Sequence, residues 1–176
     1  MFTGIIQAVG EVAAIEQTGG DVKLRIKTGA LPLEDVQLGD SIATNGVCLT
    51  VTELPGDGYW ADVSTETLSL TSLKGVVVGG AVNLEKSLTP TTALGGHLVS
   101  GHVDGLGRVV GLTRDARSWR VSIEAPADLA RYIAQKGSIC VDGTSLTVNA
   151  VEGARFELNI IPQTWEETVF SGYALG

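Results

Sequence analysis

The sequence has little of what marks several common protein classes. Its two cysteines, Cys48 and Cys140, lie far apart and form no CxxC motif, so neither a disulfide scaffold nor a zinc site is indicated. Only 12 basic residues stand against 20 acidic ones, and the formal net charge of -8 would repel a phosphate backbone. Nucleic acid is therefore not an expected partner.

Signals for export, membrane insertion and hydrolase chemistry are also missing. No cationic stretch precedes the apolar residues of the opening MFTGIIQAVGEV, and no apolar run approaches the length of a bilayer span. There are two histidines and no GxSxG motif, so a serine or cysteine hydrolase is not indicated. We expect a soluble cytoplasmic protein that does not bind membranes.

The sequence contains an internal repeat at a constant offset of 97 residues. At this offset Gly4 aligns with Gly101, Gly46 with Gly143, and TGIIQAVGEV with SGHVDGLGRV. Residues 1–79 and 98–176 align without a gap and share 16 identical positions. This is more than similar composition would produce, so we infer two copies of one structural unit.

Each copy is predicted to be all-β, because β-branched residues alternate between closely spaced turn signals. In the first copy, strands are expected at residues 5–14, 22–27, 41–43, 49–53, 59–63 and 81–88. The Asn-Gly and Asp-Gly pairs at 45–46 and 142–143 predict equivalent turns. Six short strands favour a closed Greek-key barrel, so two tandem barrels are expected, over residues 1–97 and 98–176.

Helices are expected to be few and the second copy to be incomplete. Apolar spacing predicts one clear helix at ADLARYIAQKG, residues 127–137, and a shorter one at residues 67–73. Because Gly176 aligns with Gly79, the last predicted strand of the first barrel has no counterpart in the second. An open barrel leaves an unpaired strand edge, so we expect the sequence to be a fragment of a longer protein.

Few side chains qualify for chemistry. His97 and His102 are five residues apart, which suits no metal signature, so no metal site is expected. We interpret His97 as a structural hydrogen-bonding residue. His102 replaces Ile5 of the first copy, and for it a functional and a structural role are equally open. Cys48, which aligns with Ser145, is on its own more typical of an inert buried side chain.

Repeated hydroxyl groups are the main feature that points to a ligand. Thr50 aligns with Thr147, Thr67 with Thr164, and Ser41 with Ser138. Such groups near aliphatic side chains suit a polar heterocycle or a polyol, and their duplication predicts two similar ligands. The stretch GLGRVVG at residues 105–111 is not read as a dinucleotide site, because it opens no helix.

Five motifs, in order, resemble the riboflavin synthase family of duplicated barrels: MFTGII, NGVCLTVTE, GGHLVSGHVDG, DGTSLTV and IIPQTWEET. The resemblance covers the whole chain. It implies two six-stranded Greek-key barrels and a C-terminal helix that joins three chains. This sequence lacks that helix and the strand before it, so trimerisation stays open. Association with lumazine synthase stays open as well.

The resemblance also implies the reaction. Two 6,7-dimethyl-8-ribityllumazine molecules dismutate to riboflavin and 5-amino-6-(ribitylamino)uracil, without a cofactor or metal. An alternative within the same fold is a lumazine- or flavin-binding antenna protein that performs no chemistry. The presence of Cys48, His102 and Ser145 favours the enzyme.

Site residues follow from the same resemblance. His102 and Thr147 would assist proton transfer, Cys48 and Ser41 would act in nucleophile or water handling, and Phe2 would contact the ring. The first barrel's pocket would be lined by Gly4, Ile5, Ile6, Cys48, Leu49, Thr50, Asp62, Val63, Ser64, Thr65, Glu66 and Thr67. The second barrel's pocket would be lined by Gly101, His102, Val103, Lys136, Ser145, Leu146, Thr147, Asn159, Ile160, Ile161, Pro162, Gln163 and Thr164.

Overall fold

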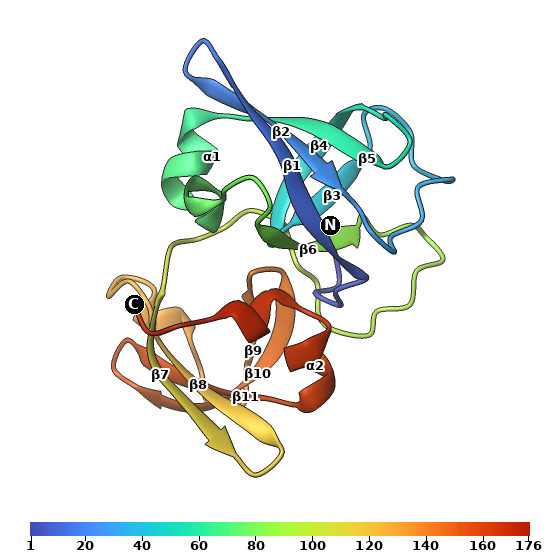
Figure 1. Ribbon diagram of the computed structural model, residues 1–176. Helices are drawn as coiled ribbons and strands as arrows, with labels where there is room; N and C mark the ends of the chain where they lie inside the picture. The colour runs from blue at the N-terminus through green and yellow to red at the C-terminus, as the bar shows by residue number, and fades with distance from the viewer.

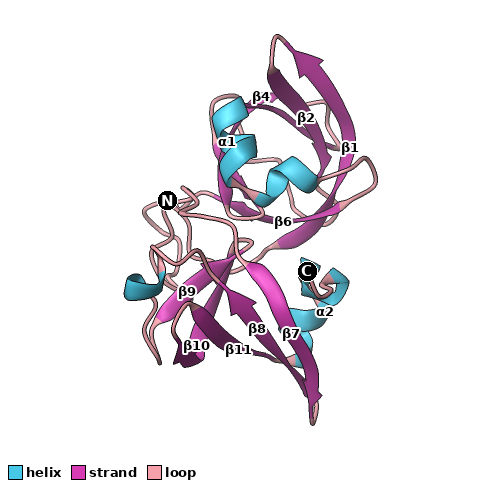
Figure 2. Cartoon of the chain, turned by 90° about the vertical axis from the view of Figure 1, so that its left-hand side faces the viewer, coloured by secondary structure: helices cyan, strands magenta, loops and turns pink.

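The computed structural model describes residues 1–176 as two β units, one above the other, with the N-terminus at their junction (Figures 1 and 2). The first unit is a closed antiparallel barrel with strand order β1-β2-β5-β4-β3-β6. Its strands are β1 (Ala8–Thr18), β2 (Asp21–Lys27), β3 (Ser41–Thr44), β4 (Val47–Glu53), β5 (Gly58–Val63) and β6 (Ala81–Lys86). All six strands predicted for this copy are present, and β1 begins later than expected.

The second unit repeats the first five strands in the order β7-β8-β11-β10-β9. They are β7 (Arg108–Asp115), β8 (Ser118–Glu124), β9 (Ser138–Val141), β10 (Thr144–Glu152) and β11 (Arg155–Ile160). No strand corresponds to β6, so β7 and β9 remain the edges of a five-stranded sheet. The predicted fold class, two tandem β units of which the second lacks its last strand, is confirmed.

Two short helices occupy equivalent places in the two units. The first, α1 (Thr65–Leu70), begins at Ser64, whose hydroxyl accepts a hydrogen bond from the N–H of Thr67. Its counterpart is α2 (Pro162–Glu166), which has proline in its first turn. Each is followed by a 3₁₀ turn, η1 (Ser72–Gly75) and η3 (Val169–Gly172). None of the helices has the length and apolar composition needed to cross a membrane.

The helix predicted at residues 127–137 is wrong. This segment forms only the 3₁₀ turn η2 (Ala130–Tyr132), and the chain is already extended at Ile133. Lys136 adopts a positive φ of 65°, and its N–H donates to the carbonyl of Val148 on β10. Ile133 packs against the core of the second unit. Tertiary pairing with β10 therefore overrides the helical spacing of the apolar residues.

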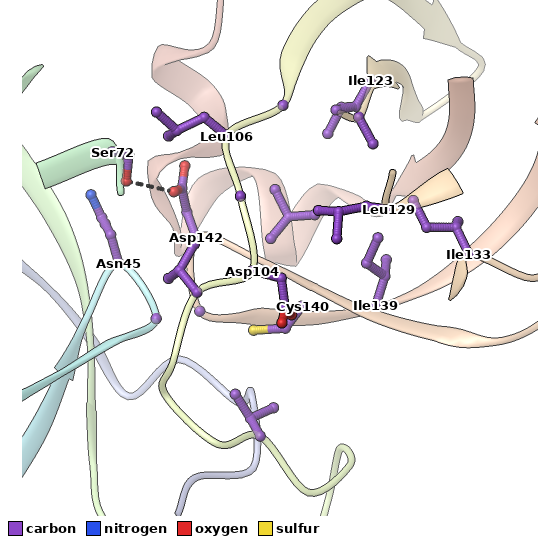
Figure 3. A pocket seen from close by; sticks show the side chains of 18 of the residues that line it. Asn45, Ser72, Asp104, Leu106, Ile123, Leu129, Ile133, Ile139, Cys140 and Asp142 are labelled. Carbon is purple, nitrogen blue, oxygen red and sulfur yellow. Dashed lines mark hydrogen bonds between the residues drawn. The ribbon is translucent and has the colours of Figure 1, made fainter. Parts of the chain in front are cut away.

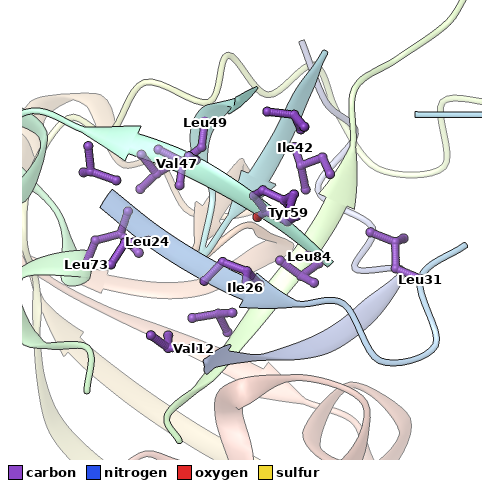
Figure 4. Close-up of a cluster of buried hydrophobic side chains, with 14 of the residues drawn as sticks. Val12, Leu24, Ile26, Leu31, Ile42, Val47, Leu49, Tyr59, Leu73 and Leu84 are labelled. Carbon is purple, nitrogen blue, oxygen red and sulfur yellow. The ribbon is translucent and has the colours of Figure 1, made fainter. Parts of the chain in front are cut away.

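Each unit has its own hydrophobic core. The core of the first barrel contains 16 buried apolar residues, among them Leu24, Ile26, Ile42 and Leu84, whose side chains converge inside the barrel (Figure 4). Tyr59 is fully buried there, with its hydroxyl 2.5 Å from that of Thr44, and burial raises its pKa. The second core has seven buried residues. Because each unit packs around its own core, the contact between the units is made by other residues.

The junction has approximate twofold symmetry because equivalent residues of the two copies meet there. Phe2 and Val99 exchange two backbone hydrogen bonds, of 2.8 and 3.0 Å. Their side chains form a small buried cluster with Ala43, against which Cys48 and Cys140 pack. The turns at Gly46 and Gly143 also touch: a Cβ atom on Gly46 would lie 2.6 Å from the backbone nitrogen of Gly143. The two halves therefore meet in one fixed arrangement.

A polar network beside this cluster also links the two units. The side-chain amide of Asn83, fully buried on β6, donates to the carbonyl of Asp142 (2.8 Å), and its oxygen accepts from the N–H of Val169 (2.9 Å). The Asp142 carboxylate accepts from Ser72 (2.9 Å) and from the hydroxyl of Tyr173 (2.5 Å); Figure 3 shows the first of these bonds. Burial, and next the Asp142 charge, raise the pKa of Tyr173.

The open flank of the second unit forms a cavity of about 820 Å³. Ile123, Leu129, Ile133 and Ile139 line it from the second unit (Figure 3). It lies between the edges β7 and β9, where the first barrel has β6 between β1 and β3. The cavity is therefore a property of the five-stranded sheet, and its apolar lining is the core left uncovered there.

We expect Asn83→Ala to lower the free energy of unfolding by about 2 kcal/mol, because the half-buried carbonyl of Asp142 and the half-buried N–H of Val169 lose their partner. Urea unfolding followed by circular dichroism measures this. Asn149→Ala is the matched control, since Asn149 also lies on a strand and only its backbone carbonyl is hydrogen-bonded to a side chain. Equal losses in both variants would contradict a linking role for Asn83.

Candidate functional site

The leading segment of each copy lies against the other copy. The N–H of Ser145 donates to the carbonyl of Gly4 (2.7 Å), and the N–H of Cys48 donates to the carbonyl of Gly101 (2.8 Å). These two bonds are equivalent under the repeat offset of 97 residues. Residues 4–6 therefore belong to the second barrel's surface and residues 101–103 to the first barrel's surface.

The predicted grouping of these two segments is thus wrong. We had expected residues 4–6 beside residues 48–50, and residues 101–103 beside residues 145–147. Instead, Val103 packs against the core of the first barrel, and Ile6 approaches Gly143 of the second. The exchange comes from the Phe2–Val99 pairing, a contact between copies that no local pattern announces.

Gly4 shows how closely the exchanged segment sits. Its φ is +77°, and a Cβ atom there would lie 2.6 Å from the Cβ atom of Ser145. Both the backbone conformation and the space exclude any side chain. Gly101 has the equivalent conformation against Cys48. The glycines at positions 4 and 101 are therefore explained by the close packing of each segment against the opposite barrel.

The first candidate site gathers residues on the outer face of the first barrel. Strands β3, β4 and β5 are antiparallel neighbours, and Ser41 lies opposite Thr50. Thr50 and residues 64–66 at the start of α1 are exposed, while Cys48 is half-buried. His102 is exposed and joins this site because it follows Gly101. The prediction had placed His102 in the second barrel's pocket with Thr147, whereas its position after Gly101 brings it to the first barrel, near Cys48.

The second candidate site has the same framework and different chemistry. Ser145, Leu146 and Thr147 lie on β10, with Ser138 opposite Thr147. Residues 159–164 run from the end of β11 into α2. Where the first site has Cys48 and His102, this one has Ser145 and Ile5. The Cys48 thiol and the His102 imidazole therefore belong to the first site alone, and at these two positions the second site offers a hydroxyl and an apolar contact.

His97 is the residue whose connection to a site the sequence did not reveal. Its Nδ1 atom lies 2.7 Å from the hydroxyl oxygen of Ser145, and its N–H donates to the carbonyl of Thr3 (3.0 Å). The interpretation of His97 as a hydrogen-bonding residue is confirmed. In the sequence, the only indication of this role was that His97 stands just before residues 101–103, which lie against the first barrel. That Ser145 is its partner follows from the way the two units meet.

Phe2 does not contact a ligand surface. It has 0% exposure and lies in the junction cluster, where its ring approaches Gly101. A ring bound on the outer face of either barrel would not reach it. The structure places Phe2 among the residues that hold the two units together, in contrast to the predicted aromatic contact.

The remaining thiol, Cys140, lies where the first copy has Ala43. Burial raises its pKa to about 12, and the nearby carboxylates of Glu85 and Asp142 add to the effect. A thiol held neutral in this way is a packing group. The side chains of His, Cys, Asp and Glu form no cluster of three or more that could hold a metal ion.

Comparison with known proteins agrees with this duplicated arrangement. The family model of the lumazine binding domain matches twice, over residues 3–87 and 100–176. The chain is 49% identical to the riboflavin synthase of Photobacterium phosphoreum over 176 residues, 100% of this chain and 81% of that protein. It is 39% identical to the riboflavin synthase of Bacillus subtilis (strain 168), again over 100% of this chain and 81% of the relative.

Solved structures of similar shape carry lumazine and flavin ligands. The structure of LumP complexed with riboflavin matches with a TM-score of 0.90 at 26% identity, over 100% of this chain and 95% of that one. LumP complexed with 6,7-dimethyl-8-(1'-D-ribityl) lumazine matches with a TM-score of 0.88 at 25% identity and the same coverage.

The raised pKa of Cys140 predicts slow alkylation. Iodoacetamide reacts with the thiolate, and a pKa of about 12 leaves about one thiolate in ten thousand at pH 8. In a Cys48→Ser variant, where Cys140 is the sole cysteine, we expect labelling about a thousandfold slower in the folded chain than in urea. The rate should rise with pH towards that pKa. Mass spectrometry measures the labelling. Equal rates in the folded and unfolded chains would contradict the burial of Cys140.

Proposed function

Since the chain belongs to the riboflavin synthase family, we propose that it dismutates two molecules of 6,7-dimethyl-8-ribityllumazine. One molecule would give up a four-carbon unit to the other, which yields riboflavin and 5-amino-6-(ribitylamino)uracil. The observation that carries this proposal is the pair of similar surfaces with different reactive groups. A reaction between two copies of one substrate needs two similar sites that treat the copies differently.

Positioning is the main catalytic contribution in this proposal. Two heterocycles held face to face react as if in one molecule, which removes much of the entropic barrier of a bimolecular step. The hydroxyls of Thr50 and Thr147 lie at equivalent places on the two barrels and would orient the two rings alike. Because both surfaces lie on the outside, we propose that a first site of one chain meets a second site of another in a trimer.

The first site would supply the proton transfers. An imidazole takes up and returns a proton near neutral pH, and His102 is exposed beside Cys48. The Cys48 thiol, with the Ser41 hydroxyl, would add to the ring or hold the water that does so. At the second site Thr147 would assist the return of the proton. In this proposal no metal or cofactor takes part in these steps. We place the reaction in the cytoplasm. Whether the chain associates with lumazine synthase is a question for experiment.

A second candidate function is ligand binding without chemistry. The LumP complexes with a lumazine, with riboflavin and with flavin mononucleotide favour it, since this fold holds such ligands there. The thiol and imidazole of the first site favour the enzyme, because a binder has no use for them. Turnover separates the two candidates.

We expect the chain to form riboflavin from 6,7-dimethyl-8-ribityllumazine, detected by its fluorescence, and His102→Gln to lower the rate about a hundredfold. Glu16→Gln serves as the control, since Glu16 is exposed and β1 contributes no residue to either candidate site. His102→Gln should still bind riboflavin. Tight binding by the unaltered chain without any product would instead support the non-catalytic function.

A further inference from the structure

The buried carboxylate of Glu85 holds the N-terminal segment in place. It is 2% exposed on β6, opposite Ala43 of β3. Its Oε1 atom accepts from the N–H and the hydroxyl of Thr3, both at 2.6 Å. Its Oε2 atom accepts from the N–H of Gly4 at 2.9 Å. Three donors from two successive residues thus converge on one side chain.

The charge of Glu85 is balanced by these donors rather than by a cation. None of the ion pairs in the chain includes Glu85. Successive backbone N–H groups that point the same way form a small anion-binding concavity, and Gly4, with its positive φ, completes one here. Hydrogen bonds to an ionised acceptor are about twice as strong as neutral ones. The Thr3 hydroxyl also accepts a hydrogen bond from the N–H of Ile5 (3.1 Å), so the backbone of Ile5 is held in place as well.

Both backbone polar groups of Gly4 are hydrogen-bonded, each to a different barrel. Its N–H donates to Glu85 of the first barrel, and its carbonyl accepts from the N–H of Ser145 of the second (2.7 Å). A shift of the Thr3–Gly4 peptide would therefore move residues 4–6 relative to residues 145–147. We propose that Glu85 is a positioning residue for the second candidate site, although it belongs to the first barrel and meets the site only at the backbone N–H of Gly4. The proposal rests on the proposed function, because it presumes a ligand at that site.

The second copy shows why the effect is confined to one site. Residues 100–102 repeat the local geometry, since the N–H of His102 donates to the hydroxyl of Ser100 (3.1 Å) as Ile5 does to Thr3. Within this chain no carboxylate accepts from the N–H groups of Ser100 and Gly101. Glu85 therefore acts on the segment that completes the second site and leaves the first site unchanged.

The test is a titration of the whole chain with riboflavin, followed by two-dimensional NMR of the backbone amides. Signals of residues 64–67 report on the first site and those of residues 163–164 on the second. In Glu85→Gln the side-chain NH₂ faces a backbone N–H, so we expect riboflavin to bind at least about tenfold more weakly at the second site. Affinity at the first site should stay within about twofold. Glu16→Gln, an exposed acid on β1, should change neither.

Thr3→Ala is the second variant, in case Glu85→Gln does not fold. It keeps the carboxylate and removes one donor, so it should weaken the second site alone, by a smaller factor. Equal weakening at both sites, or no change at the second, would overturn the positioning role and leave the proposed function standing. Absence of riboflavin shifts at both sites in the unaltered chain would contradict the proposed function itself, and the inference with it.

Discussion

The crossing of the two leading segments is the constraint on which the rest of the structure depends. Phe2 and Val99 pair with each other across the junction, and the segments that follow, residues 4–6 and 101–103, each lie against the opposite barrel. Glycine at positions 4 and 101 is then the only residue that fits, and the chain has glycine at both. Neither half possesses a complete site without the other.

This arrangement also explains how a symmetric scaffold can hold unequal sites. The framework residues are shared: Ser41 lies opposite Thr50, and Ser138 opposite Thr147. The reactive groups come from positions at which the copies differ, Cys48 against Ser145 and His102 against Ile5. Because His102 crosses to the first barrel, it joins Cys48, and both reactive groups collect at one site. Duplication thus provides two matched surfaces, and divergence at a few positions gives them different side chains, to which the proposed function assigns different tasks.

The polar groups at the junction make the arrangement specific. Asn83 and Glu85 are both buried on β6, two residues apart, and each binds partners from beyond its own sheet. Asn83 binds the second barrel directly, and Glu85 binds the segment that crosses to it. Apolar contact alone would tolerate sliding between the barrels, whereas a buried polar group without its partner costs free energy. The last strand of the first barrel therefore closes that barrel and also orients the second.

The sequence by itself determined the duplication, the positions of the strands in the first copy and the family, because each depends on spacing along the chain. The offset of 97 residues placed the turns at Gly46 and Gly143 correctly, and alternation located all six strands of the first copy. Only the tertiary structure decided which barrel each segment completes, that residues 127–137 form a short 3₁₀ turn and then bond to β10 at Lys136 and Gly137 instead of forming a helix, and that Phe2 is buried at the junction. These outcomes depend on contacts between residues that are distant in the chain, and such contacts cannot be predicted from the local sequence pattern.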